Sequence, residues 1–105
     1  MTRVNIATLF SQGLFFALKL IEYLYRREVA MKPEYKSLYE KFGLNVVYYR
    51  KRKKLTQLQL AELVDIDRSH VSAIELGNVG VSFDVVFKLC EVLEVKPSEL
   101  FDFRD

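Results

Sequence analysis

Leu55 to Gly77 reads LTQLQLAELVDIDRSHVSAIELG, and the spacing of its residues decides the fold. Thr56 and Asp67 are residue types that cap helix N-termini, and Gly77 suits the left-handed residue that ends a helix. The apolar residues match two short amphipathic helices separated by a polar break at 65–68; they are Leu58, Leu60, Ala61, Leu63, Val64, Val71 and Ile74. Neither helix could bury its apolar face alone, so the stretch predicts a helix-turn-helix.

Several of these residues resemble the helix-turn-helix of the Cro and phage-repressor superfamily, the XRE type; they are Thr56-Gln57, Leu60-Ala61, the run 66–71, Glu75 and Gly77. The similarity extends from about Phe42 to Phe101. It implies an all-α fold with a five-helix repressor-like DNA-binding domain, and a sequence-specific transcriptional regulator as the function. The runs 67–72 and 81–82 and the small size are similar to controller proteins of restriction-modification systems, although phage repressors and antitoxins share nearly all these features.

Charge is distributed unevenly along the 105 residues. From Lys32 to Arg68 nine Lys or Arg residues face five acids, a net charge of +4. From Glu75 to Asp105 three Lys or Arg residues face seven acids, a net charge of −4. The total net charge of +2 is too small to argue for nucleic-acid binding. The positive segment is nevertheless suited to binding phosphates, and the negative segment is not.

Cys90 and His70 are the only residues of their types, which excludes an internal disulfide and a cluster of thiolate metal ligands. Cys90 lies within an apolar pattern and is interpreted as a core residue. His70 is expected at an exposed position on the second motif helix. No paired carboxylates, phosphate loop or nucleophile with a nearby general base is evident, so we expect neither an enzyme nor a cofactor or metal site.

Residues 1–30 form an apolar amphipathic segment ahead of the helix-turn-helix domain, which is expected at 34–103. Its apolar residues repeat at the spacing of a helix face; they are Ile6, Leu9, Phe10, Leu14, Ala17, Leu18, Ile21 and Leu24. Polar residues such as Lys19 interrupt the run, which argues against a membrane span. The segment is therefore either an extra helix packed on the domain or a partner, or a translated upstream stretch before a start at Met31. Membrane association is the least favoured alternative.

Three further helices are expected around the motif in the domain. Pro33 suits the first turn of a helix that runs to about Lys53, with Leu38, Phe42, Val46 and Tyr49 on one face. Ser82 is expected to cap a helix at 83–94. Pro97 then starts a short helix whose Leu100 and Phe101 close the core.

The second motif helix is expected to lie in the major groove, with its N-terminal residues at base edges. Val71 and Ile74 must face the core, which leaves five positions to read bases; they are Arg68, Ser69, His70, Ser72 and Ala73. Arg68 is the strongest candidate because its guanidinium can donate two hydrogen bonds to one guanine. Ala73 can offer only a methyl contact.

Phosphate contacts are expected from six residues near the motif; they are Lys51, Arg52, Lys54, Thr56, Gln57 and Asn78. Gln57 can use its side-chain amide and the free backbone N–H groups of the first helical turn. Thr56 is equally explained as a helix cap, and the cations can also serve the helix dipole and solubility. The roles of Gln57 and Asn78 follow the pattern of related domains.

The resemblance also implies a structural salt bridge between Arg50 and Glu75, in place of a DNA contact by Arg50. Because one helix covers few base pairs, a homodimer on a pseudo-palindromic operator in double-stranded DNA is expected. Either residues 1–30 or the acidic C-terminal half would supply the interface. The alternative function is an antitoxin-like or other protein-interaction module that uses the N-terminal apolar helix. A cytoplasmic location is expected for both functions.

Overall fold

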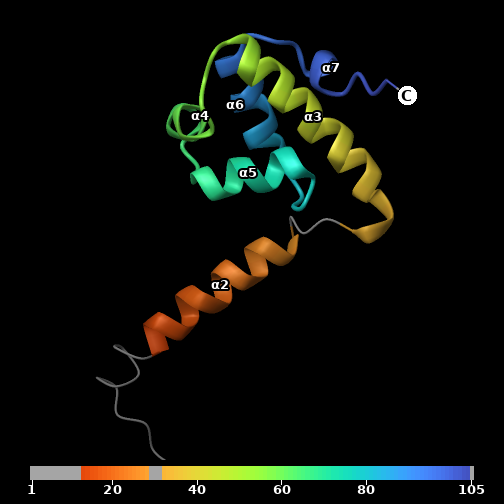
Figure 1. Ribbon diagram of the computed structural model, residues 1–105. Coiled ribbons are helices and arrows are strands. Elements are labelled where there is room, and N and C mark those ends of the chain that lie inside the picture. Colours follow the sequence, from red (N-terminus) through yellow and green to blue (C-terminus); the bar gives the residue numbers. More distant parts are fainter. Residues whose placement is uncertain (1–12, 29–31, 105) are drawn as a thin grey trace, which may run out of the picture.

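The computed structural model describes residues 13–28 and 32–104, and these contain helices but no strand (Figure 1). The elements are α2 (Leu14–Glu28), the 3-10 helix η2 (Pro33–Tyr35), α3 (Lys36–Arg52), α4 (Gln57–Val64), α5 (Arg68–Leu76), α6 (Phe83–Leu93) and α7 (Pro97–Leu100). The predicted all-α architecture is confirmed, with five helices in the domain and one extra helix before it. The predictions for Ile6, Leu9, Phe10 and Met31 lie outside the described residues.

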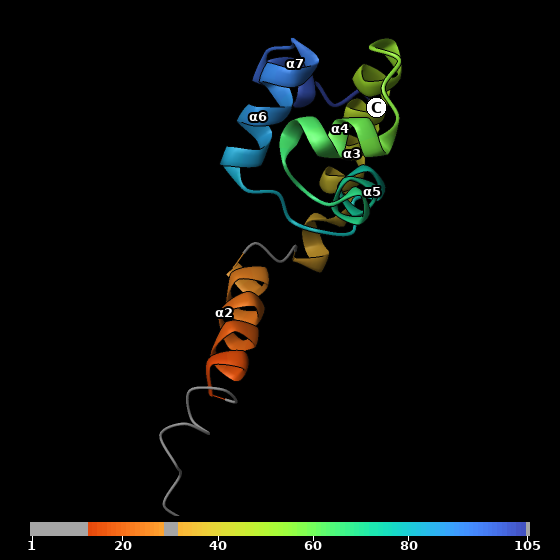
Figure 2. The same ribbon diagram turned by 90° about the vertical axis from the view of Figure 1, so that its left-hand side faces the viewer.

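Helices α3 to α7 pack around one apolar core (Figure 2). Helix α5 packs on both α3 and α4, and α4 in turn packs on α6. The buried apolar residues are Phe42, Val46, Leu60, Ala61, Val64, Val71, Ile74, Val86, Leu89, Cys90, Leu93 and Leu100. Cys90 is thus a core residue, as predicted, and burial raises the pKa of its thiol.

Two predicted core positions differ from this pattern. Leu38 lies on the expected face of α3 but is 47% exposed, because it is in the first turns of the helix, beyond the elements that cover Phe42 and Val46. Phe101 is also largely exposed and leans on the Phe42 ring, with the ring centroids 5.1 Å apart. Leu100 is therefore the fully buried residue at this end of the core, and Phe103 packs against the core partly buried.

The motif begins at a capped helix, as predicted. The Thr56 hydroxyl accepts a hydrogen bond from the Gln59 N–H at 3.0 Å, and the Gln59 side chain accepts from the Thr56 N–H at 2.8 Å. This reciprocal pair satisfies two backbone donors that have no partner within α4. Ser82 caps α6 in the predicted way, since its hydroxyl accepts from the Val85 N–H at 3.3 Å.

The start of α5 differs from the prediction. Asp67 occupies the N-cap position, but its exposed side chain makes no capping hydrogen bond. Only its backbone carbonyl accepts, from the N–H groups of His70 and Val71. The end of α5 is as predicted, since Gly77 adopts the left-handed conformation with φ of 71°.

Gly43 allows α3 and α5 to approach closely. A Cβ atom at this position would overlap with the backbone carbonyls of Ile74 and Glu75. The buried surface of α3 therefore fits directly against the C-terminal half of α5.

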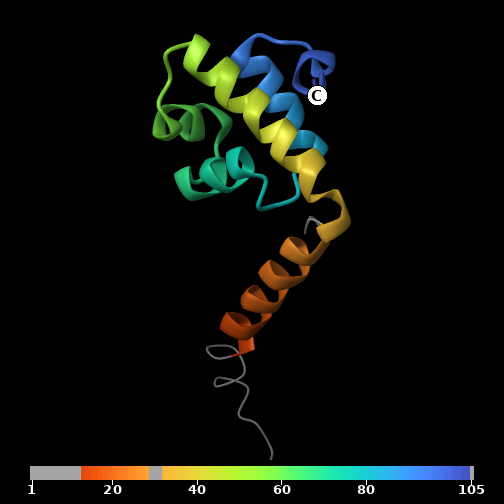
Figure 3. The ribbon, with the colours of Figure 1, turned by 45° about the vertical axis from the view of Figure 1, so that its right-hand side comes forward.

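Helix α2 stands apart from the bundle in Figures 1 and 3. Six of its large apolar side chains are exposed; they are Leu14, Phe15, Phe16, Leu18, Leu20 and Ile21. The Lys19 ammonium lies 5.6 Å from the centre of the Phe15 ring, a cation–π contact. Within 13–28 and 32–104, no helix combines the length and apolar character that crossing a membrane requires.

Candidate nucleic-acid interface

The five predicted base-reading positions on α5 differ in their access to solvent. Arg68 and Ser69, in the first turn, are exposed. His70, Ser72 and Ala73 are only half-buried, so the expected exposed position of His70 is wrong. Arg68 and Ser69 thus form the most accessible part of the predicted reading surface.

Gln57, the first residue of α4, connects this surface to the interior. Its side-chain oxygen accepts from Nη1 of Arg68 at 3.4 Å, while its Nε2 donates to Oε1 of Glu75 at 2.9 Å. One hydrogen of the amide that was expected to hold a phosphate is therefore used within the protein. The backbone N–H of Gln57 remains at the N-terminus of α4, where donors have no partner within the helix.

A buried ion pair lies directly behind Gln57. Nε of Arg50 is 2.6 Å from Oε2 of Glu75, and Nη2 donates to Oε1 at 3.1 Å. The two side chains are 11% and 4% exposed, and Nη1 of Arg50 also donates to the backbone carbonyl of Leu55 at 2.9 Å. The structure thus contains the salt bridge that the resemblance implied. Its two parallel hydrogen bonds and further partners offset the cost of burying two charges.

The basic run at 51–54, at the end of α3, contains exposed cations and one cation, Lys53, that pairs with an acid. Lys51, Arg52 and Lys54 are exposed near the start of α4, as a phosphate role requires. Lys53 lies 2.7 Å from the Glu94 carboxylate, and this hydrogen-bonded contact holds the pKa of Glu94 below its usual range. Lys53 therefore joins the basic run to the acidic half of the chain.

The C-terminal end of α5 is held by a residue that sequence reasoning missed. The Lys36 ammonium donates to the backbone carbonyls of Gly77 at 2.7 Å and Leu76 at 3.4 Å. It also donates to Oδ1 of Asn78 at 2.5 Å, so the side-chain oxygen of this predicted phosphate ligand is already in use. Lys36 and Asn78 are 42 positions apart in the sequence, so no local pattern could reveal this contact.

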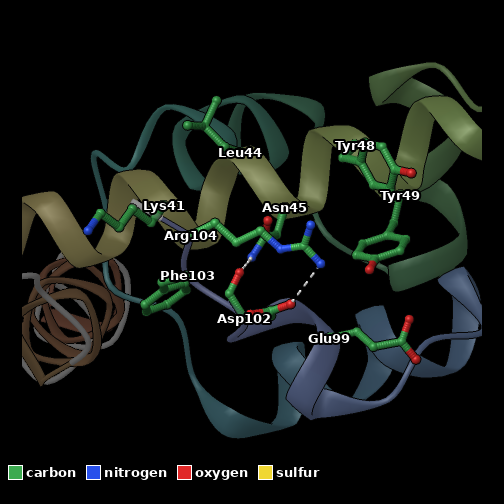
Figure 4. A pocket seen from close by; sticks show the side chains of 9 residues that line it. All are labelled: Lys41, Leu44, Asn45, Tyr48, Tyr49, Glu99, Asp102, Phe103 and Arg104. Atoms are coloured by element: carbon green, nitrogen blue, oxygen red, sulfur yellow. Dashed lines mark hydrogen bonds and ion pairs between the residues drawn. The ribbon is translucent and has the colours of Figure 1, made fainter.

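A separate pocket of about 350 Å³ lies between α3 and the C-terminal tail (Figure 4). The Asn45 side-chain amide donates to the backbone carbonyls of Leu100 and Asp102, at 2.9 and 3.1 Å. Arg104 pairs with the Asp102 carboxylate at 3.4 Å. These contacts fasten the tail to α3. Over 13–28 and 32–104, no three His, Cys, Asp or Glu side chains are grouped as a metal ion would require.

A family model described as helix-turn-helix matches residues 47–100, which include α4 and α5. The chain is similar to the control protein C.BamHI of Bacillus amyloliquefaciens, with 38% identity over 63 residues, 59% of this chain and 78% of that protein. It is also similar to an HTH-type transcriptional regulator of Methanocaldococcus jannaschii, with 34% identity over 58 residues, 55% of this chain and 88% of that protein.

Among solved structures, the restriction-modification controller protein C.AhdI from Aeromonas hydrophila superimposes with a TM-score of 0.58 and 40% sequence identity. The match covers 60% of this chain and 96% of that one. Helix α2 precedes all the residues that the family model matches.

Proposed function

Because this chain belongs to the helix-turn-helix family of transcriptional regulators, we propose that it binds a pseudo-palindromic operator as a homodimer and reads it with the first turn of α5. In this docking mode the second motif helix lies in the major groove and the first crosses the phosphate backbone. The exposed side chains of Arg68 and Ser69 are the observation that supports the proposal best. The similarity to C.BamHI and C.AhdI supports a controller role in a restriction-modification system.

Arg68 supplies most of the base discrimination in this account. Its 3.4 Å contact with Gln57 is long for a hydrogen bond, so the guanidinium can exchange it for the two acceptors of a guanine. Ser69 adds hydrogen bonds of low selectivity. The half-buried His70, Ser72 and Ala73 contribute less, through the atoms that remain accessible.

Phosphate contacts supply the sequence-independent part of the affinity. Lys51, Arg52 and Lys54 provide positive charge beside the start of α4. Thr56 and Gln57 flank the N-terminus of that helix, where unpaired backbone N–H groups bind anions. Asn78 offers its side-chain amide hydrogens from the opposite end of α5, since only its oxygen is used by Lys36.

A homodimer is proposed because one first turn of a helix reads too few base pairs for useful specificity. Two copies would place their α5 helices in successive major grooves, with half-site centres about 34–36 Å apart. Sedimentation velocity of the full chain with and without DNA measures this state directly. A complex with one chain per operator would contradict the homodimer.

Selection of bound sites from random DNA tests the whole proposal. We expect enrichment of two inverted half-sites, one helical turn apart, each containing a guanine that Arg68 contacts. Recovery of no preferred sequence would contradict sequence-specific regulation.

The exposed apolar side chains of α2 favour a second candidate function, a protein-interaction module of the antitoxin kind. The Arg68→Ala variant separates the two candidates. It should reduce operator preference if DNA reading is the function, and should leave partner binding through α2 unchanged.

A further inference from the structure

An apolar groove of about 380 Å³ lies on the domain between α3, the start of α6 and the C-terminal tail. We call it the α3–α6 groove; its lining includes Tyr35, Leu38, Val81, Phe83, Phe101 and Phe103. Phe83 is 72% exposed and Leu38 is 47% exposed, so large apolar side chains face solvent at its rim. None of the residues predicted to contact DNA lines it. Apolar surface of this kind on a small domain marks a site of interaction.

Helix α2 carries a matching surface. Its Leu14, Ala17, Leu18 and Ile21 lie on one face at helical spacing, and all are exposed. Lys19 and Glu22 lie one turn apart beside this face, and the Lys19 ammonium also covers the Phe15 ring. The helix is therefore amphipathic and leaves its broad apolar face uncovered.

The length of the connection restricts where α2 can reach. Four residues, 29–32, separate the end of α2 from Pro33, so an extended chain between Glu28 and Pro33 spans at most about 18 Å. The groove begins two residues later, at Tyr35. Connections of this length are usual between antiparallel neighbouring helices. The tether thus holds the apolar face of α2 at high effective concentration beside the groove.

We propose that α2 folds back on its own chain and places its apolar face in the α3–α6 groove. Helix α2 extends away from the bundle in Figures 1 and 3. Apolar side chains of both surfaces are exposed in this arrangement, and docking removes them from water. The docked helix would run antiparallel to α3, as in an αα-hairpin. The proposal does not depend on DNA binding, because the groove and the first turn of α5 share no residue.

Amide NMR spectra of the full chain test this docking. The double variant Leu18→Glu/Ile21→Glu places two charges on the apolar face of α2. We expect it to shift the resonances of groove residues such as Leu38, Phe83 and Phe103 while those of the α4–α5 motif stay in place. The matched control, Lys19→Glu, changes the polar face and should leave the groove resonances unmoved.

A reciprocal pair on α6 tests the groove side. Phe83 lines the groove, whereas Phe87, the next aromatic residue on the same helix, does not. Phe83→Glu should increase the hydrogen exchange of α2 amides strongly, and Phe87→Glu, which removes only a ring stacked on Phe83 at 6.0 Å, should increase it much less. Both side chains are exposed, so neither change disturbs the core.

Three results would overturn the proposal. Groove resonances that ignore the α2 variant would show that α2 does not dock there. New groove resonances in a mixture of labelled wild-type chain and unlabelled double variant would show docking between two copies. Groove resonances that move only when anionic lipid vesicles are added would identify α2 as a membrane-surface helix. For docking within one chain, we expect the chemical shifts of the groove resonances to stay the same when the protein is diluted.

Discussion

The two ends of α5 are built in opposite ways. At the C-terminal end, Glu75 is buried against Arg50, Gly77 turns the chain, and Lys36 donates to the last carbonyls. At the N-terminal end, Asp67 makes no side-chain cap and Arg68 has only a 3.4 Å contact with Gln57. One end is fixed by the fold, and the other is free to exchange its partners.

Under the proposed function, this difference separates the residues that stabilise the fold from those that read DNA along a single short helix. A fixed C-terminal end sets the angle at which α5 projects from the domain, because Gly43 lets α3 fit against it. The open N-terminal end can then present Arg68 without a large rearrangement. Changes at the fixed end should therefore cost folding stability, and changes at the open end should cost DNA preference.

The largest effect is expected at the buried ion pair. Glu75→Gln leaves the Arg50 charge inside the protein without a compensating carboxylate, and breaking such a pair costs about 3–5 kcal/mol. Urea unfolding followed by circular dichroism measures the loss in the free energy of unfolding. Lys53→Met, which breaks the exposed pair with Glu94, is the control and should cost far less, because solvent screens this pair. Equal losses in the two variants would contradict the special role of the fixed end.

A smaller loss is expected for Gly43→Ala. Alanine would favour the α3 helix by roughly 1 kcal/mol, but its Cβ would overlap with the carbonyls of Ile74 and Glu75. We expect overpacking to outweigh the gain and destabilise the domain by about 1–3 kcal/mol. A variant that is more stable than the wild type, in the same urea experiment, would show that α3 and α5 can separate without cost.

A substitution at the open end of α5 should lower DNA specificity and leave folding stability nearly unchanged. Arg68→Ala should reduce the preference for the selected operator over a scrambled duplex by about 1–3 kcal/mol, measured by fluorescence anisotropy. Its free energy of unfolding should stay within about 0.5 kcal/mol of the wild type, since Arg68 is exposed. If stability fell and the operator preference remained, the assignment of the two ends would be reversed.

The smallest effect is expected for single phosphate contacts. Lys51→Ala and Lys54→Ala should each reduce the slope of log affinity against log salt by about 0.9, on any duplex. Lys88→Ala removes a cation from the acidic half, where it pairs with Glu91 at 3.7 Å, and serves as the control. A reduction of the slope by Lys88→Ala, and none by Lys51→Ala, would place the DNA on a different face.

The local features of the motif could be predicted because they depend on neighbours in the sequence. The caps at Thr56 and Ser82 and the turn at Gly77 each need only a few adjacent residues. Asp67 shows the limit of such rules, because a good N-cap residue type does not ensure that its side chain bonds to the helix.

Contacts between distant residues were predicted only where a family supplied them. The Arg50–Glu75 pair followed from a resemblance, whereas the bonds of Lys36 to the end of α5 and of Gln57 to Glu75 had no sequence signal. The exposure of Leu38 was also missed. Helical spacing predicts on which face of a helix a residue lies. It does not predict how far along the helix the packed elements extend.

The most direct test of the two-ended α5 is an amide NMR titration of the full chain with its selected operator. We predict that the largest shift changes fall on residues 67–69 and on Gln57, with smaller changes at 75–77. Shift changes concentrated on α6 or α2, with residues 67–69 unmoved, would contradict the account.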